Sequence, residues 1–198
     1  LQKSQPLRWN VEEAKRLASR GVKELLVIAQ DSTSYGWDAS PKTSLHELFY
    51  ELDKIDGLEW LRLHYAHPSN LHRKMIAQFK NLEKLIPYID MPIQHGSNKV
   101  LKIMRRGLKA DGIKKKIDSL REANNNIAIR TSIIVGHPGE TDKEFKEMLD
   151  FISDIEFDRL GVFQYSLEEN TLAAETMKDI TPKEVKQQSF DETMALQQ

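Results

Sequence analysis

The sequence contains no cysteine among its 198 residues, which excludes disulfide bonds, thiolate zinc sites, cysteine nucleophiles and cysteine-held iron-sulfur clusters in this chain. No apolar run has the length needed to cross a bilayer, and no charged and then apolar signal segment opens the chain. Neither sign of charge is in excess, because 29 lysine and arginine residues face 30 aspartate and glutamate residues. We therefore expect a soluble, cytoplasmic protein without direct nucleic-acid binding.

Helical patterns alternate with short apolar patterns that are typical of buried strands. Such an alternation indicates βαβ units with right-handed crossovers and a parallel sheet. We expect strands at residues 24–30, 59–65, 88–91, about 128–135 and 159–165. We expect helices at residues 11–19, 44–54, 71–80, 97–106, 110–123, 141–153 and 182–198.

Polar residues collect at or near the carboxyl ends of these strands, where barrel enzymes place their chemistry. The fold class expected is therefore α/β, as a partial TIM-type barrel of parallel βα units. The chain begins with a helix and with Leu1, which is not a natural start. We expect that the first strand of the barrel is missing and that the chain is part of a longer protein.

The segment from Arg130 to Glu140 carries the most specific local pattern. Its strand residues precede Gly136 and Gly139, which let a ligand approach the backbone where the strand ends. Thr141 then has the spacing of a capping box that opens the next helix, whose free amide groups lie beside the loop. In α/β proteins this is a common place for ligands, although an ordinary strand-to-helix turn has the same pattern.

Other polar segments also follow predicted strands. Residues 30–36 combine Asp31 with hydroxyl groups that suit ribose or an amine, and an ordinary polar turn is the alternative. His64 and His67 lie three residues apart at a strand end, a spacing that disfavours a metal pair without a third ligand. Ser97 has a hydroxyl suited to capping the helix that follows it.

Three arginines are candidates for binding a carboxylate. Arg105 and Arg106 either complement a helix C-terminus or hold a carboxylate in a bidentate manner. Arg130 is the better candidate for a buried role because it begins the most apolar strand.

Glu168 and Glu169 face either a substrate or solvent. The sequence has no GxGxxG motif, no GxxxxGK motif and no evident Ser/His/Asp order.

Five motifs together resemble the radical S-adenosylmethionine (SAM) domain of the methylthiotransferases, in family order over residues 11–176. The motifs are Ala29 to Gly36, Trp60 to Pro68, Pro92 to Ser97 with Val100 to Arg106, Arg130 to Thr141, and Tyr165-Ser166 with Glu168-Glu169. Asp31, His95 and His137 resemble the branch that modifies an aspartate of a small-subunit ribosomal protein rather than the branch that modifies tRNA. Asn170 departs from the glycine expected after the paired glutamates.

This resemblance implies an enzyme in which a 4Fe-4S cluster binds and cleaves SAM. The resulting radical takes a hydrogen from the β-carbon of the substrate aspartate, and a methylthio group is installed there. The family carries the cluster on a CxxxCxxC loop, which would end just before Leu1. We expect a SAM-domain part at residues 1–180 and, at residues 181–198, a helix that leads toward an absent β domain. This chain alone is expected to be inactive.

The matching motifs also imply individual roles. The residues expected on the SAM side are Gln30, Asp31, Gln94, Ser97, Arg130, Ser132, Gly136 and Glu140. The residues expected on the substrate side are His64, His95 and Glu168. No catalytic residue and no metal ligand is assigned. The alternatives are a tRNA methylthiotransferase, a cysteine-free binding module of the same fold, and a different α/β enzyme that binds a small metabolite.

Overall fold

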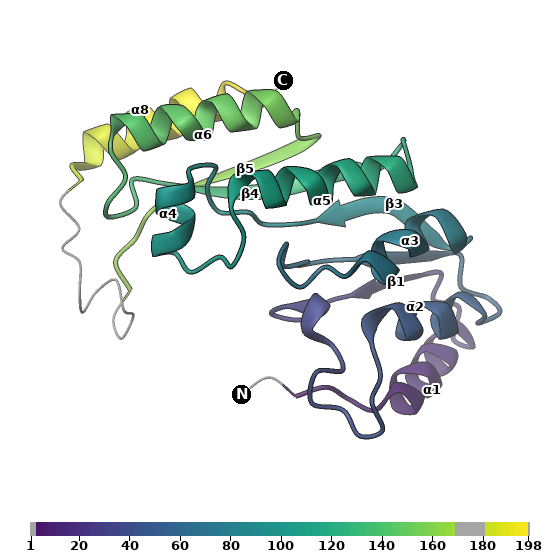
Figure 1. Ribbon diagram of the computed structural model, residues 1–198. Coiled ribbons are helices and arrows are strands. Elements are labelled where there is room, and N and C mark those ends of the chain that lie inside the picture. The colour runs from purple at the N-terminus through teal and green to yellow at the C-terminus, as the bar shows by residue number, and fades with distance from the viewer. Residues whose placement is uncertain (1–2, 169–180, 198) are drawn as a thin grey trace. The chain divides into compact units, whose positions relative to one another are not determined.

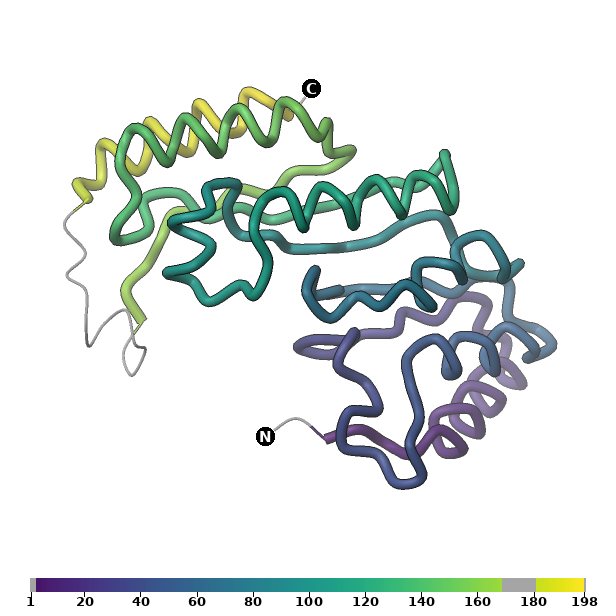
Figure 2. The backbone as a smooth tube through the Cα atoms, in the orientation of Figure 1, coloured from purple at the N-terminus to yellow at the C-terminus, as the bar shows by residue number. Residues whose placement is uncertain are grey.

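The computed structural model describes residues 3–168 and 181–197, and its helices and strands are labelled in Figure 1. The chain forms two compact units, which are described separately. The first comprises Leu1–Met91 with Lys116–Ala128, and the second comprises Pro92–Lys115 with Ile129–Gln198. Figure 2 follows the backbone through both of them.

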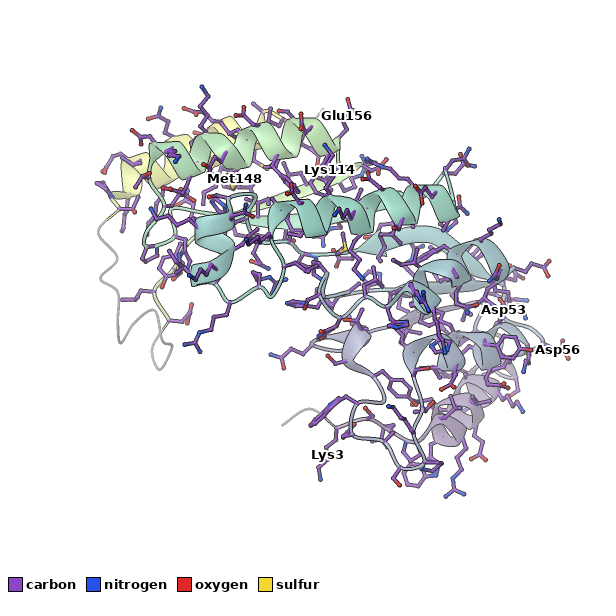
Figure 3. The ribbon with its side chains drawn as sticks, in the orientation of Figure 1. Lys3, Asp53, Asp56, Lys114, Met148 and Glu156 are labelled. Carbon is purple, nitrogen blue, oxygen red and sulfur yellow. The ribbon has the colours of Figure 1, made fainter. Side chains whose placement is uncertain are left out.

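The first unit holds three parallel strands, which lie next to one another in the order in which they occur in the chain. Its elements are α1 (Leu7–Ala18), β1 (Glu24–Val27), the 3-10 helix η1 (Ser32–Ser34), α2 (Leu45–Asp53), β2 (Trp60–Leu63), α3 (Arg73–Asn81) and β3 (Leu85–Asp90). Each helix between strands supplies the crossover that a parallel connection requires. Asp53, which is labelled in Figure 3, lies at the end of α2. Its side chain accepts a hydrogen bond from the backbone amide of Lys84, just before β3, at 2.9 Å.

The second unit contains two parallel strands, together with helices that precede and follow them. Its elements are α4 (Asn98–Ile103), the first part of α5 (Ala110–Ala123), β4 (Ala128–Val135), α6 (Asp142–Ile155), β5 (Arg159–Gln164) and α8 (Lys183–Met194). β4 pairs with β5 in parallel from Arg130 to Val135, and α8 packs against β5. In Figure 1, α6 and α8 are the green and yellow helices of this unit.

The alternation of burial along β4 shows how the core of the second unit is built. Ile129, Thr131, Ile133 and Val135 are buried, while the residues between them are half-buried on the opposite face. Helix α6 turns one stripe of apolar side chains inward, because Met148, Ile152 and Ile155 recur at helical spacing. The figure with side chains labels Met148 on this helix (Figure 3).

The expected order of helices and strands is confirmed, with differences at the boundaries. The first helix begins at Leu7 rather than residue 11, directly after Pro6. The first strand ends at Val27 rather than residue 30, because the amide of Ala29 donates to the Ser32 hydroxyl and the chain turns into η1. The third strand begins at Leu85 rather than residue 88, and the last helix covers 183–194.

Candidate functional site

The loop between β4 and α6 takes the shape that its glycines permit. Gly136 and Gly139 have φ angles of +72° and +91°, which residues with a side chain rarely adopt. The amide of Gly136 donates a hydrogen bond to Oε1 of Glu140 at 3.0 Å. The carboxylate at the end of the loop therefore holds the residue that begins it.

Glu140 is bound on its other side by a buried histidine. Oε2 of Glu140 lies 2.9 Å from Nε2 of His95, and the two side chains are 6% and 0% exposed. The amide of Ser97 donates to Nδ1 of the same ring at 2.9 Å. Because Nδ1 accepts, the ring proton is on Nε2, and Nε2–H donates to the carboxylate. Both oxygens of Glu140 and both nitrogens of His95 are thus occupied within the protein.

Ser97 does not cap α4 through its side chain, so that expectation is wrong. It occupies the N-cap position, but its hydroxyl donates to Oε2 of Glu147 in α6 at 2.6 Å. Gly96 has no side chain, which allows α6 to pack closely against the segment that precedes α4. A Cβ atom there would lie 2.8 Å from Cβ of Phe151, which is closer than real Cβ contacts, and a tight 3.0 Å from Cα of Met148.

Gln94 lies at a strained backbone position beside β4. Its φ angle is +75°, which is uncommon for a residue other than glycine. Its amide donates to the Ser132 carbonyl and its carbonyl accepts from the Ile134 amide, each at 2.9 Å. These two bonds hold the peptide in place against its local preference, and the Gln94 side chain is half-buried.

The predicted capping box at the start of α6 is confirmed. Glu144 accepts a hydrogen bond from the backbone amide of Thr141 at 3.1 Å and another from the Thr141 hydroxyl. Lys99 forms an ion pair with the same carboxylate at 3.1 Å. The hydrogen bond from the Thr141 hydroxyl is the main cause that lowers the pKa of Glu144 to about 2, with burial opposing it and Lys99 assisting.

Two predicted SAM-side residues lie on one face of β4 beside Gly161 of β5. Arg130 and Ser132 alternate with the buried residues of the strand and are half-buried. On the neighbouring strand, a Cβ added to Gly161 would lie 3.7 Å from Nη2 of Arg130 and 3.6 Å from Oγ of Ser132. Phe163 Cε2 would be nearer still, at 3.5 Å, so the missing side chain of Gly161 leaves a cradle with room for about one methyl group next to a guanidinium and a hydroxyl.

In the first unit, Asp31 organises its own loop. Its carboxylate accepts hydrogen bonds from the Thr33 amide at 3.0 Å, from the Asn70 side chain at 2.8 Å and from the hydroxyls of Thr33 and Ser34. Burial raises the pKa of Asp31, but the hydrogen bonds from Ser34, Thr33 and Asn70 outweigh it, so the pKa lies below its usual range. Gln30, which precedes it, is exposed.

The two histidines after β2 have different surroundings. Nδ1 of His67 lies 2.8 Å from the Ser69 hydroxyl, so His67 belongs to the turn that it begins. Nδ1 of His64 lies 4.0 Å from Oδ2 of Asp90, and the His64 side chain is 21% exposed. Among residues 3–168 and 181–197 no group of three histidine or acidic side chains is suited to a metal ion.

The remaining predicted residues follow either β5 or α4 in the sequence. Glu168 is exposed, and Glu169 and Asn170 lie outside the described residues. Arg106 donates to the carbonyl of Pro92 at 2.6 Å, and Arg105 has a φ angle of +54° just after α4.

The structure also adds residues that sequence reasoning missed. Glu147 binds Ser97, and Gly161 lies beside Arg130 and Ser132. Lys186 of α8 places its stem against Gly136 and donates to the Tyr165 carbonyl at 3.1 Å. Glu147 and Lys186 are ordinary charged residues of predicted helices, so nothing in the sequence distinguishes them. Gly161 could have been singled out from the sequence, because a glycine inside a predicted strand often marks a place where a ligand or another backbone approaches closely.

Comparison with known proteins places this geometry in a family. The family model described as the radical SAM superfamily matches residues 4–152. The chain therefore belongs to the radical SAM superfamily.

Within that family, the sequence is similar to curated proteins named ribosomal protein uS12 methylthiotransferase RimO. Identity is 46% over 188 residues with the protein of Clostridioides difficile strain 630, covering 95% of this chain and 42% of that protein. It is 43% over 196 residues with that of Symbiobacterium thermophilum, covering 99% and 40%. The chain thus spans about two fifths of the length of these relatives.

Solved structures confirm the fold class expected from the sequence. Coproporphyrinogen III oxidase (HemN) from Escherichia coli, described as a radical SAM enzyme, matches with a TM-score of 0.67 over 96% of this chain and 43% of that one, at 19% identity. Streptococcus suis SuiB bound to S-adenosylmethionine matches with a TM-score of 0.62 over 98% and 41%, at 12% identity. At such identities the likeness concerns the fold alone.

Proposed function

We propose that this chain is the catalytic core of a radical SAM methylthiotransferase that adds a methylthio group to the β-carbon of an aspartate in ribosomal protein uS12. The observation that carries the proposal is the 43–46% identity to RimO proteins along nearly the whole chain. Because the chain spans only 42% of the first of these relatives, the activity is assigned to the whole gene product that contains it.

The second unit offers donors that fit SAM. A guanidinium suits a carboxylate, a hydroxyl suits an amine or a ribose, and Arg130 and Ser132 present both beside the space left by Gly161. Bound SAM is the source of the hydrogen-abstracting 5′-deoxyadenosyl group and of the methyl group. We assign Arg130 and Ser132 to direct contact with it.

The other predicted SAM-side residues divide into two groups. Gln94 and Gly136 present backbone at the strand ends, and Gln30 is exposed, so these remain candidates for contact. Asp31, Ser97 and Glu140 use their side chains to hold neighbouring segments, and their proposed role is to position the loops. His95 is proposed to act in the same indirect way on the substrate side, because it is fully buried.

The residues of this chain do not fit a 4Fe-4S cluster. Its sequence has no cysteine, and the thiolates that hold such clusters must come from polypeptide outside these 198 residues. We expect that this chain, mixed anaerobically with iron and sulfide, stays colourless. A stable iron-sulfur absorption band from residues 1–198 alone would contradict the proposal that the cluster ligands lie outside these residues.

The proposal also includes the cellular location of the protein, the division of the chain into two parts and the role of Glu168. Among the described helices, none is long and apolar enough to span a membrane, and a ribosomal-protein substrate favours the cytoplasm as the site of action. The division into a SAM-domain part at residues 1–180 and a connecting helix at 181–198 remains a prediction. Glu168, exposed at the end of β5, is proposed to face the protein substrate.

The test uses the whole gene product, reconstituted anaerobically with SAM, a reductant and uS12. We expect uS12 to gain one methylthio group on an aspartate, measured by peptide mass spectrometry, and a uS12 variant with alanine at that position to gain none. Modification of tRNA instead would assign the chain to the tRNA branch. Binding of SAM without its cleavage would support the binding module without radical chemistry.

A further inference from the structure

Lys186 is a buried lysine in α8, a helix that lies beyond residues 4–152, the part of the chain that matches the radical SAM family model. Helix α8 packs against β5, and the buried residues Lys186, Ser189 and Thr193 recur along it at helical spacing. Only 7% of Lys186 is exposed, whereas lysine is almost never buried unless its charge is bound. The contacts of Lys186 therefore identify which parts of the second unit it stabilises.

The stem of Lys186 lies directly against the backbone of Gly136, where the loop between β4 and α6 begins. A Cβ atom at Gly136 would lie 2.5 Å from Cγ of Lys186 and 3.2 Å from both Cδ and Cε. The methylene groups of the lysine thus occupy the space that a side chain at position 136 would need. Since Gly136 also has a φ angle of +72°, two separate requirements favour glycine at this position.

The ammonium group of Lys186 binds the residue that directly follows β5. Its Nζ donates a hydrogen bond to the Tyr165 carbonyl at 3.1 Å and lies 5.5 Å from the centre of the Tyr165 ring. Hydrogen bonds from a charged donor are stronger than those between neutral groups. One side chain from α8 therefore contacts the carboxyl ends of two neighbouring parallel strands, β4 and β5.

Tyr165 is itself in contact with the β4 side of this arrangement. Its amide donates to the carbonyl of Val135 at 2.8 Å, just before Gly136. Its ring meets the ring of His137 edge to face, with the two centres 4.9 Å apart. The backbone of Tyr165 and the start of the loop thus form one connected group, and Lys186 touches both parts of it.

We propose that Lys186 is a positioning residue of the SAM site, which fixes the end of β4 to the end of β5 and so holds the 136–140 loop in the conformation that receives SAM. This inference rests on the proposed function, in which Gly136 is a candidate for contact with SAM. The action of Lys186 is indirect, because its ammonium group binds backbone and its stem covers Gly136. A loop that is already held in its binding conformation loses less entropy when the ligand binds.

The first test measures the SAM dissociation constant of the whole gene product, reconstituted anaerobically. Lys186→Met keeps a stem over Gly136 but removes the donor to Tyr165, and it should raise the constant by about 3- to 10-fold, the usual effect of one hydrogen bond. Lys186→Arg keeps a charged donor and should recover most of the affinity. Lys183→Met makes the same change at an exposed position of α8 and should have no effect. Wild-type affinity in Lys186→Met would overturn the proposal.

The second test asks whether Lys186 and Gly136 act together, with the same dissociation constant as its measure. Gly136→Ala should weaken SAM binding through both the backbone angle and the overlap with the lysine stem. In the Lys186→Ala background the overlap is gone, so Gly136→Ala should weaken binding by a smaller factor. Gly112→Ala in α5 provides the control and should act alike in both backgrounds. Equal factors for Gly136→Ala in the two backgrounds would show that the stem does not hold the loop.

The third test does not depend on SAM. Hydrogen exchange of the ligand-free whole gene product is followed by mass spectrometry on peptides that contain the amides of Gly136, Glu140 and Tyr165, all of which are hydrogen-bonded. Lys186→Met should speed their exchange by at least about threefold and leave the peptides of α6 unchanged. Faster exchange throughout the second unit would indicate general destabilisation and overturn the positioning role. If exchange changes only in the loop and at Tyr165 but the wild type binds no SAM, the proposed function fails while the role of Lys186 in holding the loop stands.

Discussion

His95 and Glu140 are joined by a buried hydrogen bond of 2.9 Å that ties the segment before α4 to the loop after β4. Since Glu140 also holds the Gly136 amide, one histidine fixes the shape of a loop that is 45 residues away in the sequence. Neither side chain has an atom to spare for a ligand. Their contribution to function is the position of the loop backbone.

We expect His95→Ala to lower the free energy of unfolding by about 1 to 3 kcal/mol, because it leaves the Glu140 carboxylate buried without its donor. The SAM affinity of the whole gene product should fall as well. His95→Gln, whose amide reaches toward Glu140, should recover more of both than His95→Asn, which reaches only toward Ser97. Urea denaturation and calorimetry provide the measurements, and equal losses for the three variants would contradict this role.

Gly36 and Gly21 have similar backbone conformations but different surroundings, so alanine variants of the two separate backbone strain from steric overlap. Both have positive φ angles, +88° and +91°, but a Cβ at Gly36 would lie 2.1 Å from the Thr43 carbonyl oxygen, while at Gly21 nothing lies within 4 Å. Gly21→Ala should cost about 1 to 2 kcal/mol from the left-handed backbone alone. Gly36→Ala should cost about 3 kcal/mol or more, since backbone must move. Thermal unfolding of the two variants measures the difference, and similar costs would show that the loop after η1 adapts freely.

Asp31 should stabilise the protein in a pH-dependent way. Its pKa is lowered on folding, so its contribution is complete above the ordinary value of about 3.9 and is lost as pH falls through the folded value. Asp31→Asn should therefore be less stable than the wild type at pH 7, and the difference should shrink below about pH 4. Urea titrations at a series of pH values test this, and a difference that is constant with pH would rule out the ionised carboxylate as its origin.

Glu144, in the second unit, should also make the stability of the protein depend on pH. Its pKa is lowered to about 2, so the stabilisation that it gives α6 is present above the unfolded value and disappears as pH falls toward 2. Glu144→Gln keeps the side-chain shape but removes the charge beside Lys99 and the helix N-terminus. It should be less stable than the wild type at pH 7 and should approach it near pH 2. Lys143→Gln, at an exposed neighbouring position, provides the control.

Gly161→Val tests the cradle beside Arg130 and Ser132. Valine suits a strand, but its side chain would occupy the space next to both polar groups. We expect the SAM dissociation constant of the whole gene product to rise by at least about tenfold, which corresponds to about 1.4 kcal/mol. Gly112→Ala in α5 should leave it unchanged. Unaltered SAM binding by Gly161→Val would move the SAM site away from this face of β4.

The sequence by itself determined the local features of this protein. The strand β4, the capping box at Thr141 and the glycine loop after β4 follow from residue composition and from backbone preferences that act over a few residues. The absence of cysteine likewise settled that no thiolate ligand for a cluster lies in this chain. The family resemblance rested on such short motifs, which is why it could be stated before the fold was known.

Only the tertiary structure decided how these segments use their polar groups. Asn70 reaches Asp31 across 39 residues, and Glu147 takes the Ser97 hydroxyl across 50, which turns an expected helix cap into a contact with α6. His95 forms a buried hydrogen bond with Glu140. Nε2 of His64 is buried without a hydrogen-bond partner in the described part of the chain, which also follows only from the folded structure. A sequence pattern reports what neighbours along the chain prefer. Hydrogen bonds between distant segments depend on packing that brings them within about 3 Å, and that distance is set by the fold.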